Sequence, residues 1–491
     1  MPEQSRRVAI TLAVRDAFEV FRGICNVEDA AELVLAMGVF KFISDPGEEP
    51  ARDKPSPGDV QPYVLPGQGS FRALLEAGRS ADLGHRINAA LAAAEQHNAE
   101  LEALFHGVDF NVPRLGGEAS KAQALRKLMR VFNTPAFDFG SDRQGTPEAA
   151  AFMCDAILAH AAEADGKRSG QSFTPSSLAE LIARLMQPRV GESVYDPCSG
   201  MGSTLIACSR QARLHGAGGG GCSLYGQEVN GRALGLARMS LFLHGEPDWR
   251  LEWGDTLRQP KWLNGHGQLQ TFDVVVCDPP FSLRDWGYDK ADTDPYQRYE
   301  RGIPPRASAD FAFISHMLAS LRSEGGRMAV LVSLGVLFRS GAERHIRQQL
   351  IQENLVDAII ALPAKLLTHG SHATAILVLR KNRTADDVLF IDASQCYQHG
   401  RARNVLRAED IDLIDSTYHD RSTVAGFSHR ASPTEIAAND YNLLAARYLH
   451  VADQTETVDL ASLRAERAQL AADLARLEHK LGALMEGIRQ G

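Results

Sequence analysis

The sequence predicts an α/β protein built around a largely parallel β-sheet, with a helical N-terminal domain and a C-terminal coiled-coil-like helix. Three observations support this fold class. From residue 193, short β-branched and apolar runs alternate with helical stretches, as strands and crossover helices do in a parallel sheet. Residues 1–165 carry apolar positions at helical spacing, and leucines recur every three or four residues in 457–491.

Composition excludes several classes of protein. The 491 residues are 44% hydrophobic and 23% charged, which allows two or three globular domains. We expect neither a membrane protein nor one exported by a signal peptide, because no apolar run approaches a membrane span and the start is polar. The seven scattered cysteines form no Cys-x-x-Cys pair, which favours a cytoplasmic location. A net charge of -9 means that nucleic acid must be attracted by local basic surface or by a partner.

The chain is expected to contain four segments. These are a helical accessory domain in 1–165, the α/β domain in 166–395, a C-terminal extension in 396–456 and an amphipathic partner-docking helix in 457–491. The first segment shows no cluster of chemically active residues. The extension is polar and predicted to be irregular. In the last segment, seven leucines and one isoleucine form a stripe that a helical partner can bury.

A glycine turn follows the first predicted strand of the α/β domain. The strand ends at Asp196, and Gly200-Met201-Gly202 lead into a helix that begins near Thr204. Such a turn lets the backbone approach a ligand at the N-terminus of the helix. The dinucleotide fingerprint requires a third small residue where Leu205 stands, so a nicotinamide or flavin dinucleotide is disfavoured. Asp196 suits a cationic ammonium better than a pyrophosphate.

Two more acids follow the next strands. Glu228 ends the second strand, where a carboxylate can accept both ribose hydroxyls of an adenosine. Asp255 follows the third strand and is placed to accept from an adenine amino group. Each acid alone could be a helix cap or a surface charge. Together with Asp196 they describe an adenosine with a cationic amino-acid tail, so the sequence predicts a Rossmann-like domain that uses S-adenosylmethionine.

The fourth predicted strand ends in Asp278-Pro279-Pro280-Phe281. The prolines fix the backbone so that a carbonyl and the Asp278 side chain converge, and Phe281 offers a stacking face to a planar base. Methyl transfer to an aromatic amine requires its lone pair to be freed from the ring. Hydrogen bonds from the amine to Asp278 and to the Pro279 carbonyl favour that state. The alternative is a simple Pro-Pro turn.

The order of these motifs resembles the γ arrangement of amino-group DNA methyltransferases, in which Phe173-Thr174-Pro175 precedes the glycine turn. The segments SADFAFISHML, GVLFRSGAERHIRQQLI, VDAIIALP and NDYNLLAARYL further resemble the modification subunit of type I restriction-modification systems. The resemblance implies methylation of adenine N6 in DNA, with 278–281 holding the flipped base. It implies a cofactor site made of Phe173, Thr174, Pro175, Asp196, Ser199, Gly200, Met201, Gly202, Ser203, Thr204, Glu228, Asp255 and Asp278.

The resemblance also implies partners, namely double-stranded DNA, a DNA specificity subunit and a restriction or helicase subunit. Asp278 stands where the family usually has Asn, and Met201 where it usually has a small residue. A relative from another phage-defence system therefore stays open. A methyltransferase of RNA or protein glutamine is a second alternative, which the segments after Asp310 disfavour. A non-catalytic scaffold is a third, which the intact DPPF motif disfavours.

Cations and aromatics interleave between Phe281 and Asp310, a composition that suits a phosphate backbone and an unstacked base. We expect DNA contact from Arg284, Trp286, Tyr288, Tyr296, Arg298, Tyr299, Arg301 and Arg306. A plain surface loop is the alternative. No metal is expected, because His369 and His372 have no further ligands nearby and methyl transfer needs none.

Overall fold

The computed structural model describes residues 3–48, 63–66, 69–77, 80, 82–140, 146–165, 173–216, 220–367, 373–400, 403–449, 465, 467–474 and 476–478. The chain divides into two compact units, Met1–Leu449 and His450–Gly491. In the second unit, 467–474 and 476–478 are helical, and Leu470, Leu474 and Leu477 are exposed. The rest of the leucine-rich helix predicted for 457–491 lies outside the described residues.

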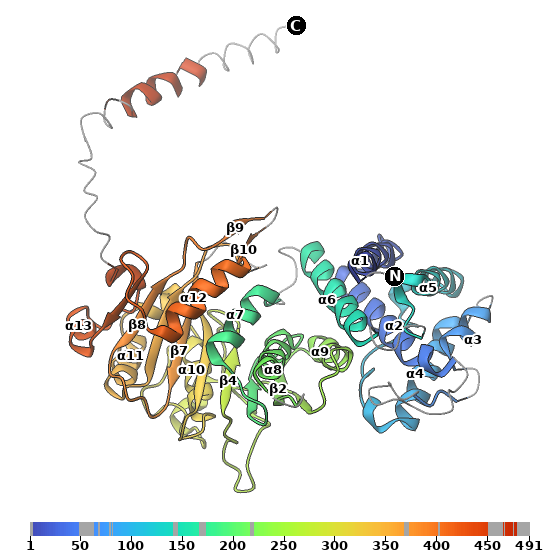
Figure 1. Cartoon of the computed structure of the whole chain (residues 1–491), viewed down its shortest axis with the longest axis horizontal. Helices are drawn as coiled ribbons and strands as arrows, with labels where there is room; N and C mark the ends of the chain where they lie inside the picture. Colours follow the sequence, from blue (N-terminus) through green and yellow to red (C-terminus); the bar gives the residue numbers. More distant parts are fainter. Residues whose placement is uncertain are drawn as a thin grey trace. The chain divides into compact units, whose positions relative to one another are not determined.

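A nine-stranded sheet in the order β11-β8-β6-β7-β5-β4-β1-β2-β3 organises the first unit (Figure 1). Strands β3, β2, β1, β4 and β5 run parallel, whereas β7 runs antiparallel between β5 and β6, and β11 runs antiparallel to β8. The strands are β1 (Ser193–Asp196), β2 (Ser223–Glu228), β3 (Trp249–Trp253), β4 (Val274–Cys277), β5 (Arg327–Ser333), β6 (Val356–Ala361), β7 (Thr374–Arg380), β8 (Val388–Asp392) and β11 (Ser428–Ala431). A separate pair joins β9 (Gln398–His399) to β10 (Asn404–Val405).

Helices cover both faces of the sheet, so its central strands are apolar on both sides. Val274 and Val276 of β4 face one apolar cluster, and Val275 and Cys277 face the other. The first cluster contains α7 (Ser176–Met186), α8 (Ser203–His215), part of α9 (Gly231–Leu243) and α12 (Ala408–Asp420). The second contains α10 (Asp310–Ala319), α11 (Ala342–Gln352) and α13 (Pro433–Ala438). The predicted parallel-rich α/β fold is confirmed.

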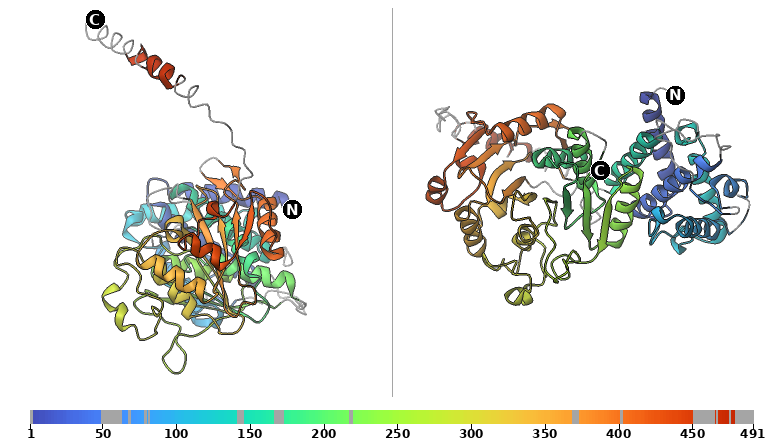
Figure 2. Two further views of the ribbon diagram at one scale, coloured as in Figure 1. Left: turned by 90° about the vertical axis from the view of Figure 1, so that its left-hand side faces the viewer. Right: turned by 60° about the horizontal axis from the view of Figure 1, so that its bottom comes forward.

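The N-terminal part is helical, as predicted. It consists of α1 (Glu3–Glu19), α2 (Val27–Glu48), α3 (Phe71–Glu76), α4 (Leu83–His97), α5 (Glu118–Phe132) and α6 (Thr146–Asp165). These helices share one apolar core, which extends to Leu236, Met239 and Leu243 of α9. Both figures show them gathered beside α9 (Figures 1 and 2). The helical part is therefore joined by apolar packing to the helix that follows β2.

The prediction of an irregular extension in 396–456 is wrong for its described residues. Helix α12 packs Ile411, Ile414 and Tyr418 into the apolar cluster beside α7, and β11 extends the sheet. These three positions follow helical spacing, but the charged residues between them obscure the pattern. Among the described residues, no helix is long and apolar enough to span a lipid bilayer.

Phe272, just before β4, provides a test of the core. Its fully buried ring stacks on Tyr195 with centroids 4.6 Å apart. Phe272→Ala is expected to lower the free energy of unfolding by about 3 to 5 kcal/mol, through lost transfer energy and the cavity left behind. Phe338→Ala, at a ring that is 48% exposed, should change it by less than about 0.5 kcal/mol. Urea unfolding measures both, and equal effects would contradict this packing.

Candidate active site

The carboxyl ends of β1, β2, β3 and β4 lie along one edge of the sheet. The strands are parallel, and Val194 of β1 pairs with Leu224 of β2 on one side and with Val274 of β4 on the other. This register places Asp196, Glu228 and the residues after Cys277 at the same edge. Ligands of open parallel sheets bind at such an edge. The acids that the sequence separates by up to 82 positions are thus brought together.

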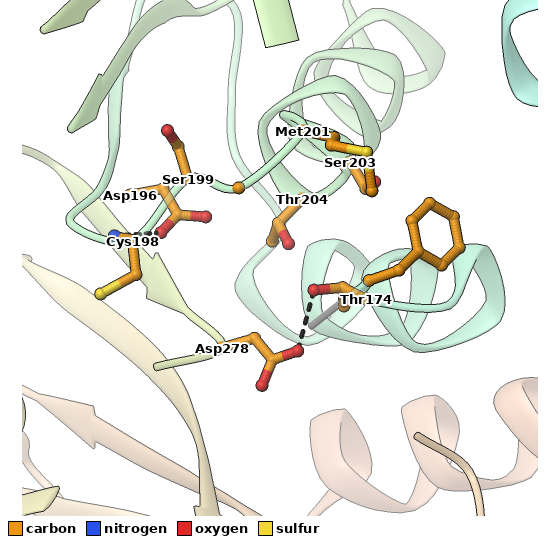
Figure 3. A pocket seen from close by; sticks show the side chains of 10 residues that line it. Thr174, Asp196, Cys198, Ser199, Met201, Ser203, Thr204 and Asp278 are labelled. Carbon is orange, nitrogen blue, oxygen red and sulfur yellow. Dashed lines mark hydrogen bonds between the residues drawn. The ribbon is translucent and has the colours of Figure 1, made fainter. Parts of the chain in front are cut away.

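A pocket opens at this edge between the glycine turn, the N-terminus of α8 and the residues that precede α7 (Figure 3). Most of the predicted cofactor residues line it. The lining consists of Phe173, Thr174, Asp196, Cys198, Ser199, Gly200, Met201, Ser203, Thr204 and Asp278. Cys198 was not predicted from the sequence as a site residue, because a thiol without a neighbouring base or metal ligand does not indicate a binding site.

The glycine turn requires its glycines. Gly200 has a φ of 50° and Gly202 a φ of 83°, in the left-handed region that side chains disfavour. The amide of Gly202 donates to the Ser199 carbonyl at 2.8 Å, which closes the turn. Gly202 is also the N-cap of α8 and has no side chain to cap the helix. The first amides of α8 are therefore left for a ligand, and the helix dipole favours a negative group there.

Three buried acids define the electrostatics of the site. Asp196 is 2% exposed, and Glu228 and Asp278 are each 9% exposed, yet none forms an ion pair within the described residues. Burial, together with the nearby Asp278 and Glu228 carboxylates, raises the pKa of Asp196 to about 8. Burial raises the pKa of Asp278 to about 6 and also raises that of Glu228. Uncompensated buried acids favour a cationic ligand.

Asp278 has one oxygen engaged and one free. The Thr174 hydroxyl donates to Asp278 Oδ2 at 2.9 Å, as Figure 3 shows. Asp278 Oδ1 is buried and has no hydrogen-bond partner among the described residues. Buried acceptors are rarely left unpaired, so this oxygen is available to an N–H donor. In the same pocket, the Cys198 amide donates to Asp196 Oδ1 at 3.0 Å and orients that carboxylate.

Glu228 and Asp255 lie outside the pocket lining. Glu228 accepts from the amides of Gly200, at 2.9 Å, and Asn230, at 2.8 Å, so it ties the glycine turn to the start of α9. Asp255 is half-buried, accepts from the amides of Leu257 and Arg258, and lies 3.5 Å from the Arg258 guanidinium. Both acids follow strands at the site edge. The structure therefore places them beside the pocket lining and with backbone partners of their own.

The remaining predicted site residues surround the lining. Pro175 is the N-cap of α7, and Gly202 is buried behind the turn. After Asp278, Pro279 is buried and Pro280 is exposed. Phe281 is half-buried and packs against the apolar cluster of α7 and α8.

The prediction of DNA contact in 282–309 is wrong for three of its residues. Trp286 and Tyr299 are buried in a small apolar cluster, with ring centroids 5.5 Å apart. Arg298 is 6% exposed and donates to Asp294 at 2.7 Å and to the Leu257 carbonyl at 2.9 Å. These side chains hold the loop together. The prediction failed because interleaved arginine and aromatic residues occur both in apolar cores and on surfaces. Arg284 and Arg306 of this loop are exposed, so DNA contact stays a prediction for them.

Two exposed apolar residues at the same edge were missed. Val229 follows β2 and Trp253 ends β3, and each is 64% exposed. The Trp253 indole donates to the Val229 carbonyl at 2.9 Å, which holds the two strand ends together. Apolar side chains beside the acids provide a surface for the flat, apolar part of a ligand. The position of Val229, an apolar residue directly after the strand-end acid Glu228, could have indicated that it belongs to the site.

The start of α9 is also pinned from the N-terminal helices. Arg232 lies 2.7 Å from Asp29, 3.2 Å from Glu28 and 3.6 Å from Glu32, all on α2. Asn230 caps α9, and its amide donates to Glu228 at the site edge, so this ion-pair network on α9 also supports that edge.

For metals, no cluster of three or more ligating side chains occurs among the described residues. His369 and His372 lie outside them.

The strand order and the acid-lined pocket define a Rossmann-like methyltransferase that uses S-adenosylmethionine. Residues 151–457 match the model of the N-6 DNA methylase family. The chain is 30% identical over 431 residues to the type I restriction enzyme HindI methylase subunit of Haemophilus influenzae, covering 83% of this chain and 94% of that protein. It is 29% identical over 395 residues to the MpnII methylase subunit of Mycoplasma pneumoniae, covering 78% and 72%.

Among solved structures, the chain matches the type I restriction-modification methyltransferase subunit of Streptococcus thermophilus. The TM-score is 0.77 at 27% identity, over 90% of this chain and 100% of that one. The chain belongs to the N-6 DNA methylase family. The predicted resemblance, the cofactor S-adenosylmethionine and the methylation of adenine N6 in DNA are confirmed at the level of this family. The family favours DNA over the RNA and protein-glutamine alternatives.

Asp196→Asn tests the buried acids in the ligand-free protein. The pKa of Asp196 in the folded state, about 8, lies above its ordinary 3.8. The folded wild type therefore binds an extra proton between about pH 4 and pH 8, and this group lowers the unfolding free energy by roughly 1.4 kcal/mol per pH unit there. We expect Asp196→Asn to be more stable than the wild type at both pH values, and its advantage to be larger at about pH 8 than at about pH 5.

Urea unfolding at both pH values measures this difference. Asp16→Asn, at an exposed position of α1, is the matched control. Wild type and Asp196→Asn with parallel pH profiles would contradict the burial of an uncompensated acid.

Proposed function

We propose that the pocket holds S-adenosylmethionine through its acids and its glycine turn, and that Asp278 to Phe281 hold an adenine base extruded from DNA. The observation that carries this proposal is the group of three buried carboxylates without a cationic partner in the described residues. A ligand with a positive ammonium and a positive sulfonium relieves that electrostatic cost. The free amides of α8 suit the carboxylate of the same amino-acid tail.

The other proposed cofactor contacts follow the strand ends. We assign Glu228 to the ribose hydroxyls and Asp255 to the adenine amino group of the cofactor. Both carboxylates already accept backbone amides, but a carboxylate has about four lone-pair sites, so a further donor can be accommodated. Val229 offers an apolar face to the adenine ring. The remaining contacts are assigned to Phe173, Thr174, Pro175, Asp196, Ser199, Gly200, Met201, Gly202, Ser203 and Thr204.

Catalysis, in this proposal, depends on how the chain holds the target amine. Asp278 Oδ1 accepts one amine N–H and the Pro279 carbonyl accepts the other, which directs the nitrogen lone pair out of the ring. Thr174 keeps the Asp278 carboxylate in place through its bond to Oδ2. Phe281 stacks on the extruded base and offsets part of the few kcal/mol that extrusion costs. S-adenosylmethionine supplies the methyl group, and Asp278 or water takes the proton released from the amine.

Asp278→Ala tests these assignments. It should abolish methylation of DNA because Asp278 orients the target amine, and it should change cofactor affinity by no more than a few fold because Asp196 and Glu228 remain to face the cationic cofactor. Calorimetry measures cofactor binding, and mass spectrometry of digested DNA identifies the product as N6-methyladenine. Asp16→Ala, at an exposed site on α1, should retain activity. Methylation by Asp278→Ala, or N4-methylcytosine as the sole product, would sink the assignment.

We further propose that the chain acts in the cytoplasm within a complex that contains a DNA specificity subunit and a restriction or helicase subunit. A net charge of -9 gives little attraction to DNA over most of the surface, so sequence-specific binding requires a partner. Leu470, Leu474 and Leu477 recur at helical spacing and are exposed, which suits a helical partner. The type I relatives support the restriction-modification setting over another defence system.

Removal of 457–491 should uncouple the chain from its specificity partner and leave cofactor binding intact, since the pocket lies in the other compact unit. Co-purification and gel-shift experiments with full-length and truncated chains measure this. The isolated full-length chain is expected to bind DNA weakly and without sequence preference. Efficient methylation of one defined sequence by that chain alone would show a self-sufficient enzyme.

A further inference from the structure

A second pocket lies at the opposite edge of the sheet from the cofactor pocket. Arg380 at the end of antiparallel β7 pairs with Arg327 at the start of β5, which places this pocket where the parallel strands begin. The cavity is open to solvent and measures about 380 Å³. The lining includes Asp357, Arg380, Lys381, Arg383, Tyr418 and Arg421.

Cations outnumber acids in this pocket. Asp357, 5% exposed, is the one acid of the lining, and three guanidinium groups converge on it. Arg380 and Arg383 each lie 3.1 Å from its carboxylate, and Arg421 lies 2.9 Å away. Tyr418 also donates a hydrogen bond to Asp357, at 2.7 Å. A single carboxylate therefore faces three positive side chains.

Asp387, the acid next to this pocket, does not neutralise its excess of positive charge. Asp387 pairs with Arg421 at 2.7 Å and also with Arg430, which brings in a further cation. Lys381 has no carboxylate partner in the described part of the chain, and its ammonium donates to the Leu321 carbonyl at 2.8 Å. Its pKa is lowered by burial and by the charge of Arg301. The four cations of the lining exceed Asp357, its one acid, by three charges, and Arg430 offsets Asp387.

Several donors of the pocket are free to bind a ligand. Arg380 uses its Nε for Asp357 and Tyr418, and its two terminal nitrogens have no hydrogen-bond partner among the described residues. Arg421 Nε is buried and likewise unpartnered there. Lys381 can donate two more hydrogen bonds. Guanidinium forks and an ammonium on one concave surface are the groups that bind tetrahedral oxyanions.

We propose that this pocket binds a phosphate group. A phosphate dianion reduces this excess of positive charge and offers several oxygens to the free donors of Arg380, Lys381 and Arg421. Two sources of that group exist, a free phosphate compound and the DNA backbone. The position favours a free compound, because the strands separate this edge from the edge where the target base is held. The site is thus independent of the methyl-transfer chemistry.

The experiment titrates inorganic phosphate and pyrophosphate into the full-length protein by calorimetry. Lys381→Ala should weaken pyrophosphate binding by about tenfold or more, the loss expected for a charge-assisted hydrogen bond. Lys381→Arg should restore most of the affinity, since it keeps the charge and the donors. Lys127→Ala removes an exposed lysine of α5 and should change nothing. Thermal unfolding and S-adenosylmethionine affinity verify that each variant is folded.

A second arm separates the two sources. Anisotropy of a labelled DNA duplex measures backbone binding in the same variants. Unchanged duplex affinity in Lys381→Ala, with pyrophosphate binding lost, supports a free phosphate compound. A matched loss of duplex affinity would assign the phosphate to the DNA backbone. Absence of saturable phosphate or pyrophosphate binding up to about 10 mM with unchanged duplex affinity, or equal losses in Lys127→Ala, would overturn the proposal.

Discussion

The burial of uncompensated carboxylates at the carboxyl edge of the sheet is the constraint on which the rest of the site depends. Asp196 and Asp278 come from strands adjacent in space, and both sit where water is largely excluded. Their raised pKa values are the cost of that burial. Under the proposed function, a cationic cofactor lowers this cost, and the free energy gained in this way favours a positively charged ligand.

That edge is held in place by hydrogen bonds to the start of α9 and by contacts between α9 and the N-terminal helices. Glu228 ties the glycine turn to Asn230 at the start of α9, and Arg232 ties the first turn of α9 to the acids of α2. The N-terminal helices share their apolar core with the far end of the same helix. The accessory helices therefore support the strand edge of the candidate site without lining its pocket, so a segment without chemically active residues has a structural role.

The protein also separates opposite charges between the two edges of one sheet. Acids gather at the carboxyl ends of β1, β2 and β4, and cations gather where β5 and β6 begin and β7 ends. With a net charge of -9 distributed in this way, the chain carries local surfaces suited to different ligands. The reversed direction of β7 makes this possible, because it delivers Arg380 and Lys381 to the edge away from the cofactor.

Sequence alone determined the fold class and the family, because alternating strands and helices, Gly200, Gly202 and the DPPF run are local patterns with few physical meanings. It could not decide which side chains face a ligand. Glu228 turned toward backbone amides, Trp286 and Arg298 entered a core, and α12 packed on the sheet. The basic pocket was equally hidden, since Asp357, Arg380 and Arg421 meet through tertiary packing. Burial and pairing depend on neighbours distant in sequence, and those only the folded chain supplies.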